Sequence, residues 1–261
     1  YHAVSALTAV PMPFRLDKLS MRLSSVFGRL ETLAHDDPDL TPDTWCLRQP
    51  CMQIGFGGRQ WVISQPISTF WVYLLGVFTS GAGLYFFSAH HGESSRLWWG
   101  ISLLLWGIGA VLAGTSYQAF GYEIKCAGKK TCSWTSWWEV VYLMFQQVSI
   151  NAMLIAVAYS CTQGAFRTVL VQYAILASLV YVGLVCVGAL LPLKPLITFE
   201  FMLWGSAPVW VFLCGLNAWR YFLSGQPIDL VLLGSWLILF GTLAAYWLYA
   251  KKQITKRLWV K

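Results

Sequence analysis

Six long apolar stretches, separated by short polar ones, dominate the pattern of this chain. They cover residues 67–89, 97–120, 137–160, 168–191, 196–223 and 229–250. Each is close to the roughly 20 residues that an α-helix needs to cross a bilayer. The pattern therefore predicts an all-α fold, a polytopic bundle of six membrane-spanning helices.

The first part of the chain has a different pattern. Leucine and phenylalanine recur at three- and four-residue spacing within residues 14–34, and charged residues fill the other face. This spacing predicts an amphipathic helix that lies on the membrane, on a partner or on the protein's own soluble face. Residues 35–50 are rich in Asp and Pro and predict an extended linker. We thus expect an N-terminal part (1–62), a transmembrane bundle (63–250) and a basic tail (251–261).

Composition supports the membrane assignment. Hydrophobic residues make up 57% of the chain and charged residues only 11%, far from the averages of soluble proteins. The net charge of +7 comes mainly from short loops and the tail, where basic residues act as topology signals and contact lipid headgroups. We therefore expect membrane lipids and other membrane protein subunits as partners, and no nucleic acid.

Basic residues are distributed unequally between the two sides of the predicted bundle. With six spans, both termini lie on one side, and that side carries most of the lysines and arginines. The other side carries only Arg96, Arg167 and Arg220. The positive side of a multi-pass protein normally faces the cytoplasm, or the matrix or stroma of an organelle.

Four of the seven cysteines lie outside the apolar stretches, and all four fall on the positive side: Cys46, Cys51, Cys126 and Cys132. Their spacing is looser than that of common zinc sites. Free thiols are the main expectation at these positions, and a four-cysteine zinc site and disulfides are the alternatives. Disulfides would require an oxidising compartment and would reverse the orientation that the charges predict.

Polar residues interrupt three of the apolar stretches. The second ends in Thr115, Ser116, Tyr117 and Gln118, the third contains Gln146, Gln147, Ser149 and Asn151, and the fifth begins with Glu200. A polar side chain in lipid needs a protein or water partner. We therefore expect a polar, ligand-binding pocket inside the bundle, formed by Ser116, Tyr117, Gln118, Gln147, Asn151 and Glu200. The competing interpretation is helix packing at residues 114–115 and a headgroup-level position for Glu200.

Absent residue types exclude several functions. The histidines are His2, His35, His90 and His91, none of them deep in a span, so this chain alone cannot build an intramembrane haem or three-histidine metal site. No mid-span lysine is present for a retinal Schiff base. We expect no cofactor other than lipid, and in particular no zinc.

Three short motifs resemble a known family. Residues 64–69 (Ser-Gln-Pro-Ile-Ser-Thr), 114–120 (Gly-Thr-Ser-Tyr-Gln-Ala-Phe) and 199–201 (Phe-Glu-Phe) are similar to uncharacterised bacterial members of the alkaline ceramidase-like transmembrane hydrolase superfamily. The resemblance implies a seven-helix bundle with zinc held by one histidine near the second span's end and two in the last span, plus a serine and an aspartate.

Carried over to this chain, the resemblance makes Ser116 the candidate serine. Gln118 stands about where the first histidine belongs, and a neutral amide is a poor zinc ligand. The seventh span with its paired histidines is absent from these residues. The resemblance thus implies the fold without the metal chemistry.

The sequence therefore predicts a non-catalytic integral membrane protein that serves as a subunit, scaffold or lipid-binding component of a larger membrane complex. No catalytic or metal-binding residue is assigned. The second hypothesis is a ceramidase-like membrane hydrolase of lipid amides. A transporter that uses Glu200 is a third hypothesis.

The charge distribution leads to a first testable prediction, that both termini face the cytoplasm, matrix or stroma. In sealed vesicles of known orientation, a protease should remove a C-terminal tag only when it acts from that side. Cleavage only from the opposite side would show that the charge distribution is misleading here.

Overall fold

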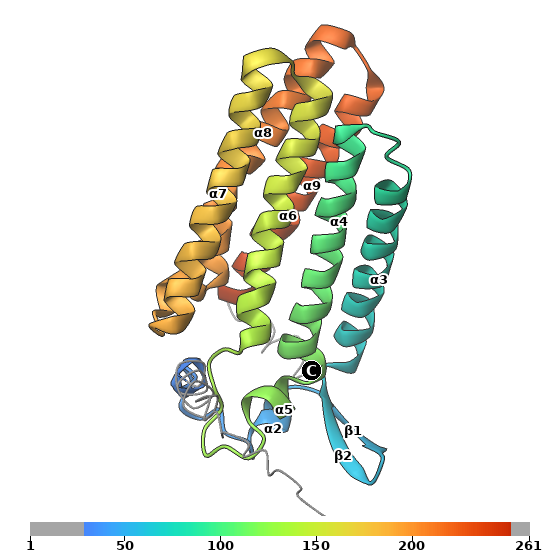
Figure 1. The fold of residues 1–261 in the computed structure, drawn as a ribbon. Helices are drawn as coiled ribbons and strands as arrows, with labels where there is room; N and C mark the ends of the chain where they lie inside the picture. Colours follow the sequence, from blue (N-terminus) through green and yellow to red (C-terminus); the bar gives the residue numbers. More distant parts are fainter. Residues whose placement is uncertain (1–28, 252–261) are drawn as a thin grey trace, which may run out of the picture.

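The computed structural model describes residues 29–251, and most of this part of the chain is helical (Figure 1). Six of its helices are long and apolar enough to cross a membrane. They are α3 (Pro66–Ser88), α4 (Ser94–Ala113), which η2 (Gly114–Ala119) continues, α6 (Trp137–Cys161), α7 (Gly164–Leu190), α8 (Phe199–Ser224) and α9 (Pro227–Lys251). The prediction of a six-span helical bundle is confirmed, with helix ends that differ from the predicted ones by a few residues. The protein is thus a multi-pass integral membrane protein.

Local sequence signals explain where the helices begin and end. Pro66 and Pro227 occupy the first positions of α3 and α9, where the fixed φ of proline suits the helix and no N–H is lost from it. At the start of α8, the Thr198 hydroxyl accepts a hydrogen bond of 3.1 Å from the Phe201 N–H. The same helix ends at Gly225, whose φ of 65° only glycine adopts readily.

The bundle is arranged around α6. Helix α4 packs on one side of α6, with α3 beyond it, while α7 and α8 pack on the other side and α9 packs on α8 (Figure 1). The apolar core near one end of the bundle includes Leu154 of α6, Val209 and Leu213 of α8 and Trp236 of α9. Helix α3 lies at one edge of the bundle (Figure 1), and most residues of α3 and α9 are exposed.

Glycines allow α3 and α4 to approach closely. A Cβ atom on Gly107 of α4 would lie 2.7 Å from the carbonyl oxygen of Gly76 and 2.7 Å from the backbone nitrogen of Ser80, both on α3. On α3, a Cβ atom on Gly83 would lie 2.6 Å from the backbone nitrogen of Leu104. Small residues at such a crossing let helices in a membrane gain van der Waals contact between their backbones.

Small elements cluster at the end of the bundle where α3 begins and α4 ends. They are η1 (Leu30–Thr32), α2 (Trp45–Arg48), α5 (Gly121–Lys125), η3 (Lys194–Ile197) and an antiparallel hairpin of β1 (Cys51–Phe56) and β2 (Arg59–Ser64). Gly57 and Gly58 form the two-residue hairpin turn with φ values of 59° and 76°, as glycine permits. Figure 1 shows the hairpin projecting from the base of α3.

The structure adds detail to the predicted N-terminal part. Residues 35–50, predicted to be an extended linker, contain α2 and are fastened by an ion pair of Arg48 with Asp37. A second ion pair joins Lys194 Nζ of η3 to Asp36 Oδ1 at 2.5 Å, and this hydrogen bond lowers the pKa of Asp36. Most of the predicted amphipathic helix at 14–34 lies outside the described residues.

The α3–α4 crossing leads to a second prediction. Gly107→Ala should destabilise the protein by about 1 to 3 kcal/mol, because the added methyl group meets the backbone of α3. Thermal unfolding in detergent measures the change. The matched control is Gly81→Ala on the exposed face of α3, where a Cβ atom meets nothing within 4 Å. Equal melting temperatures for the two variants would mean that the crossing is not tightly packed.

Candidate functional site

A π-helical turn at the end of α4 shapes the polar region that the sequence singled out. The Phe120 N–H donates a 2.8 Å hydrogen bond to the Thr115 carbonyl, five residues back. Gly114 makes this turn compatible with α3, because a Cβ atom there would lie 2.8 Å from Val72 Cγ1. Tyr73 of α3 also bonds the Thr115 hydroxyl at 2.9 Å. Single π-turns are often found at functional sites.

Within this turn, Ser116 belongs to a buried cluster that contains two charged residues. The Ser116 hydroxyl lies 2.8 Å from Glu139 Oε1 and 2.7 Å from the Ser136 hydroxyl. Lys125 forms an ion pair with the same Glu139 oxygen, while the Thr135 hydroxyl donates to Glu139 Oε2 at 2.9 Å. We call Ser116, Lys125, Thr135, Ser136 and Glu139 the ion-pair cluster.

The ion-pair cluster is shielded from water. The side chains of Lys125 and Glu139 are 8% and 3% exposed, and Ser116 is completely buried. Two charges at such a depth are stable only when they are paired and their remaining hydrogen-bonding capacity is used. Both carboxylate oxygens of Glu139 have partners here. A serine beside a carboxylate has the composition of a hydrolytic site, but full burial of Ser116 leaves no access for a substrate in this conformation.

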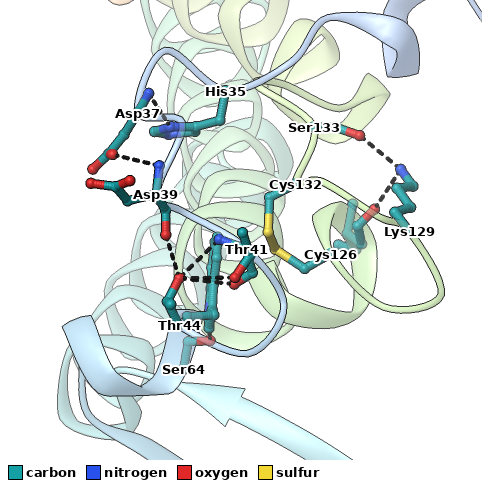
Figure 2. The surroundings of a disulfide bond; sticks show 12 residues. His35, Asp37, Asp39, Thr41, Thr44, Ser64, Cys126, Lys129, Cys132 and Ser133 are labelled. Carbon is teal, nitrogen blue, oxygen red and sulfur yellow. Dashed lines mark hydrogen bonds between the residues drawn. A yellow bond between two sulfur atoms is a disulfide. The ribbon is translucent and has the colours of Figure 1, made fainter.

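A disulfide holds the loop that supplies part of this cluster. Cys126 follows Lys125 directly and is bonded to Cys132, and a second disulfide joins Cys46 to Cys51. Figure 2 shows the Cys126–Cys132 bond beside the N-terminal segment, with Lys129 reaching the Ser133 hydroxyl at 2.8 Å. The sequence allowed zinc ligands, free thiols or disulfides at these four cysteines, and the structure contains the two disulfides.

The N-terminal segment is in turn tied to this loop. The His35 N–H donates to the Cys132 carbonyl at 3.1 Å, and the Trp134 N–H donates to the Leu33 carbonyl at 2.7 Å. Partial burial, together with the positive charge of Lys125, lowers the pKa of His35. Disulfides form in oxidising compartments, whereas the charge distribution predicts that this end faces the cytoplasm, matrix or stroma. The two observations disagree, so the orientation of the termini stays a prediction.

A second polar region lies where α6, α7 and α8 meet. The Asn151 amide of α6 donates to the Ser178 hydroxyl of α7 at 2.8 Å. One turn away on α6, Gln147 is 1% exposed. Gly205 of α8 faces both Gln147 and Tyr181 of α7, since a Cβ atom on this glycine would lie within 3.6 Å of each side chain. Several buried polar atoms here have no hydrogen-bond partner in the described part of the chain: Gln147 Oε1, Asn151 Oδ1, Tyr181 OH and Trp210 Nε1.

A cavity of about 160 Å³ lies between α4, α6, α8 and α9. It is lined mainly by apolar side chains, with the amide of Gln146 and the hydroxyl of Ser206 as polar groups: Trp106, Ala110, Ala113, Tyr142, Gln146, Ile150, Phe199, Met202, Ser206 and Leu243. Ala113 precedes Ser116 by three residues and Tyr142 follows Glu139 by three. The cavity therefore ends about one helical turn from the ion-pair cluster.

The predicted pocket residues do not form one site. Ser116, Gln147 and Asn151 are buried as expected, but Ser116 belongs to the ion-pair cluster and the other two to the α6–α7–α8 region. Gln118 is half-buried, and its Oε1 atom has no partner in the described residues. The exposed Tyr117 lies with its ring 4.8 Å from Lys125 Nζ and packs edge-on against Tyr142.

The expected inward orientation of Glu200 is wrong. This residue is exposed in the first turn of α8, directly after the Thr198 cap. A carboxylate in the first turn is stabilised by the positive end of the helix dipole and stays hydrated at the membrane surface. This exposed position in the first turn of the helix agrees with the headgroup-level interpretation that the sequence left open.

Sequence reasoning missed most of the ion-pair cluster. Lys125 was counted only as a topology charge, and Glu139, Thr135 and Ser136 were not singled out. One signal was present, because Glu139 is an acid in the first turn of an apolar span, followed by a helix with many polar residues. No spacing rule joins it to a lysine in the preceding loop.

The fold and its buried polar regions thus define a multi-pass membrane protein. No family model matches the sequence, no curated protein is significantly similar to it, and no solved structure matches its fold significantly. The resemblance to ceramidase-like hydrolases therefore stays a prediction.

The ion-pair cluster leads to a third prediction. Lys125→Met and Glu139→Gln should each destabilise the protein by about 3 to 5 kcal/mol, because each variant leaves one buried partner unpaired or poorly paired. The double variant Lys125→Met with Glu139→Gln should lose less than the sum of the two single losses, since neither charge remains. Thermal unfolding in detergent provides the comparison. Additive losses in the double variant would mean that the two charges do not act as a pair.

Proposed function

We propose that the protein is a non-catalytic, lipid-binding component of a larger membrane complex, and that the cavity between α4, α6, α8 and α9 holds one segment of the lipid. The observation that carries this proposal is the Gln146 side chain. It lines a mainly apolar cavity, in which the Ser206 hydroxyl already bonds the Leu203 carbonyl, and it forms no hydrogen bond with another described residue. A ligand that fills this cavity would therefore need an apolar part to contact the walls and a polar group to bond the Gln146 amide.

The chemistry of the cavity favours a lipid over a soluble metabolite. An amide in hydrocarbon without a partner costs several kcal/mol, and a hydroxyl, ester or amide of a lipid would supply that partner. The apolar walls would contact an acyl chain through van der Waals packing. Tyr142 and Phe199 line the end of the cavity nearest the charged region. A lipid that enters from the membrane would therefore place its polar part near Gln146.

The outer surface is compatible with neighbouring subunits. Helix α3 is largely exposed and carries several large aromatic side chains on its surface: Phe70, Trp71, Phe78, Tyr85 and Phe87. Helix α9 is similarly exposed. These helices would meet lipid in an isolated protein and other helices in a complex.

A ceramidase-like membrane hydrolase of lipid amides is the second candidate function. One observation favours it, the hydrogen bond between Ser116 and the Glu139 carboxylate next to the cavity. The resemblance implies a serine and an aspartate, whereas the carboxylate beside Ser116 belongs to a glutamate. In this reading Ser116 would become accessible only after α4 or its π-helical turn moves.

Filling the cavity tests the proposed function, which is our fourth prediction. Wild-type protein purified in mild detergent should retain a lipid that mass spectrometry detects at stoichiometric amounts. Ala110→Phe should lower the retained amount by about tenfold, equivalent to about 1.4 kcal/mol of binding free energy, because its ring occupies the cavity. Ala82→Phe, on the exposed face of α3, is the matched control and should leave the lipid in place.

Two results would contradict the proposal. Equal lipid retention in Ala110→Phe and wild type would place the lipid outside the cavity. Stoichiometric zinc in the same preparation, found by metal analysis, would contradict the non-catalytic reading and favour the hydrolase.

A further inference from the structure

A second, polar pocket lies at the end of the bundle opposite the hairpin, where α3–α4, α6–α7 and α8–α9 are joined. Its volume is about 540 Å³, and it is lined by Glu93, Ser94, Ser95, Arg96, Tyr159, Ser160, Arg167 and Arg220. It is separate from the cavity between α4, α6, α8 and α9 and from the ion-pair cluster, which both lie toward the other end of the bundle. We call it the arginine pocket.

Three arginines from three different helices converge on this pocket. Arg96 lies in the first turn of α4, Arg167 in the first turn of α7 and Arg220 in the last turns of α8. They are also the three basic residues that the sequence places on this side of the bundle between residues 63 and 250. A topology signal depends only on the side of the membrane on which a basic residue lies, and it does not require the three side chains to line one pocket.

The positive charge of the arginine pocket exceeds its negative charge. Glu93 pairs with Arg96 at 2.8 Å, and Asp229 pairs with Arg220 at 3.4 Å. Arg167 forms no ion pair with a described carboxylate, and its guanidinium carbon lies 5.4 Å from the centre of the Tyr159 ring. Stacking on an aromatic ring orients a guanidinium while its N–H groups stay free for a ligand.

Arg220 is fixed in place by buried groups. It donates to the Ser160 carbonyl at 2.8 Å, and its partner Asp229 is only 1% exposed. Asp229 also accepts a 3.3 Å hydrogen bond from Asn217, whose oxygen accepts one of 2.8 Å from Trp236. This network holds the guanidinium at the pocket wall, whereas an unsupported arginine would extend into the headgroup region.

The remaining lining groups suit an anion. Ser94, Ser95 and Ser160 contribute hydroxyl groups, although Ser95 and Ser160 bond each other at 2.6 Å. The N-terminal turn of α4 adds backbone N–H groups and the positive end of a 20-residue helix. Guanidinium groups bind phosphate oxygens through two parallel hydrogen bonds.

We propose that the arginine pocket binds a phosphate group, carried either by an anionic phospholipid of the adjacent leaflet or by a soluble phosphate. Arg167 supplies the unpaired charge, and Arg220 is the prepositioned second contact. Both sources share the same tetrahedral anion, so the experiment has one arm for each.

The test, our fifth prediction, compares full-length wild type with Arg167→Gln and Arg167→Lys. One arm adds inorganic phosphate to protein in neutral detergent, with sodium chloride at equal ionic strength as reference. The other compares nanodiscs of phosphatidylcholine with and without phosphatidic acid. The readout is the melting temperature, which a ligand raises when it binds only the folded state.

Wild type should melt at a higher temperature with phosphate. Arg167→Gln should lower the apparent affinity by about tenfold, and Arg167→Lys should fall between the two because lysine keeps the charge but loses the paired hydrogen bonds. Lys130→Gln, exposed at the opposite end, removes the same charge and should behave like wild type. Arg220 is left intact, since its loss would unpair the buried Asp229.

Stabilisation in both arms, or in one alone, supports the proposal and identifies the source of the phosphate. Absence of stabilisation of wild type in both arms would overturn it. So would an Arg167→Gln variant that responds like wild type, because the unpaired charge would then play no part.

Discussion

In a bundle surrounded by lipid, a buried polar group must find its partner within the protein, and this constraint determines the position of α6. The helix carries polar residues around much of its circumference: Glu139, Gln146, Gln147, Ser149 and Asn151, all of them buried. Ser149 and Ser102 of α4 bond each other's carbonyls at 2.8 and 2.9 Å. Asn151 turns to α7. Only a central helix has neighbours on all of these sides, so the other spans pack around α6.

The need to pair every buried polar group also explains why an ion pair, its hydrogen bonds and a disulfide occur together at the hairpin end of the bundle. Lys125 and Glu139 are stable in the interior because they pair with each other, and because Ser116 of the π-helical turn and Thr135 donate hydrogen bonds to Glu139. The Cys126–Cys132 disulfide fixes the loop between the two charges. A covalent link next to the buried lysine limits the conformations in which its charge is unpaired. The disulfides argue for an oxidising surrounding and the lysines of the same loop for a cytoplasmic one, so the two kinds of signal compete in one short segment.

Apolar stretch length was sufficient to predict the six spans, because bilayer thickness sets a length that the sequence displays directly. Burial of Gln147 and Asn151 also followed from their position within a span. The hairpin at residues 51–64 was missed because the strands are short and their pairing depends on a Gly-Gly turn. Glu200 was assigned to the interior because its span was placed three residues too early; the true helix begins at Phe199. The Lys125–Glu139 pair depends on a turn and a loop that no periodicity encodes.

The distribution of polar groups along the bundle bears on transport. From Glu139 to Asn151, α6 presents polar side chains to its neighbours, but from residue 152 to residue 158 it is apolar and buried against Trp210 and Trp236. The Trp236 ring also stacks on Trp99 with centroids 5.9 Å apart, which closes the space between α4 and α9. A substrate path needs polar or hydrated lining along its length. In the described residues this aromatic layer separates the ion-pair cluster from the arginine pocket. In this structure the two ends are therefore separated by packed aromatic rings, and with Glu200 exposed no observation in the described residues favours the transporter hypothesis.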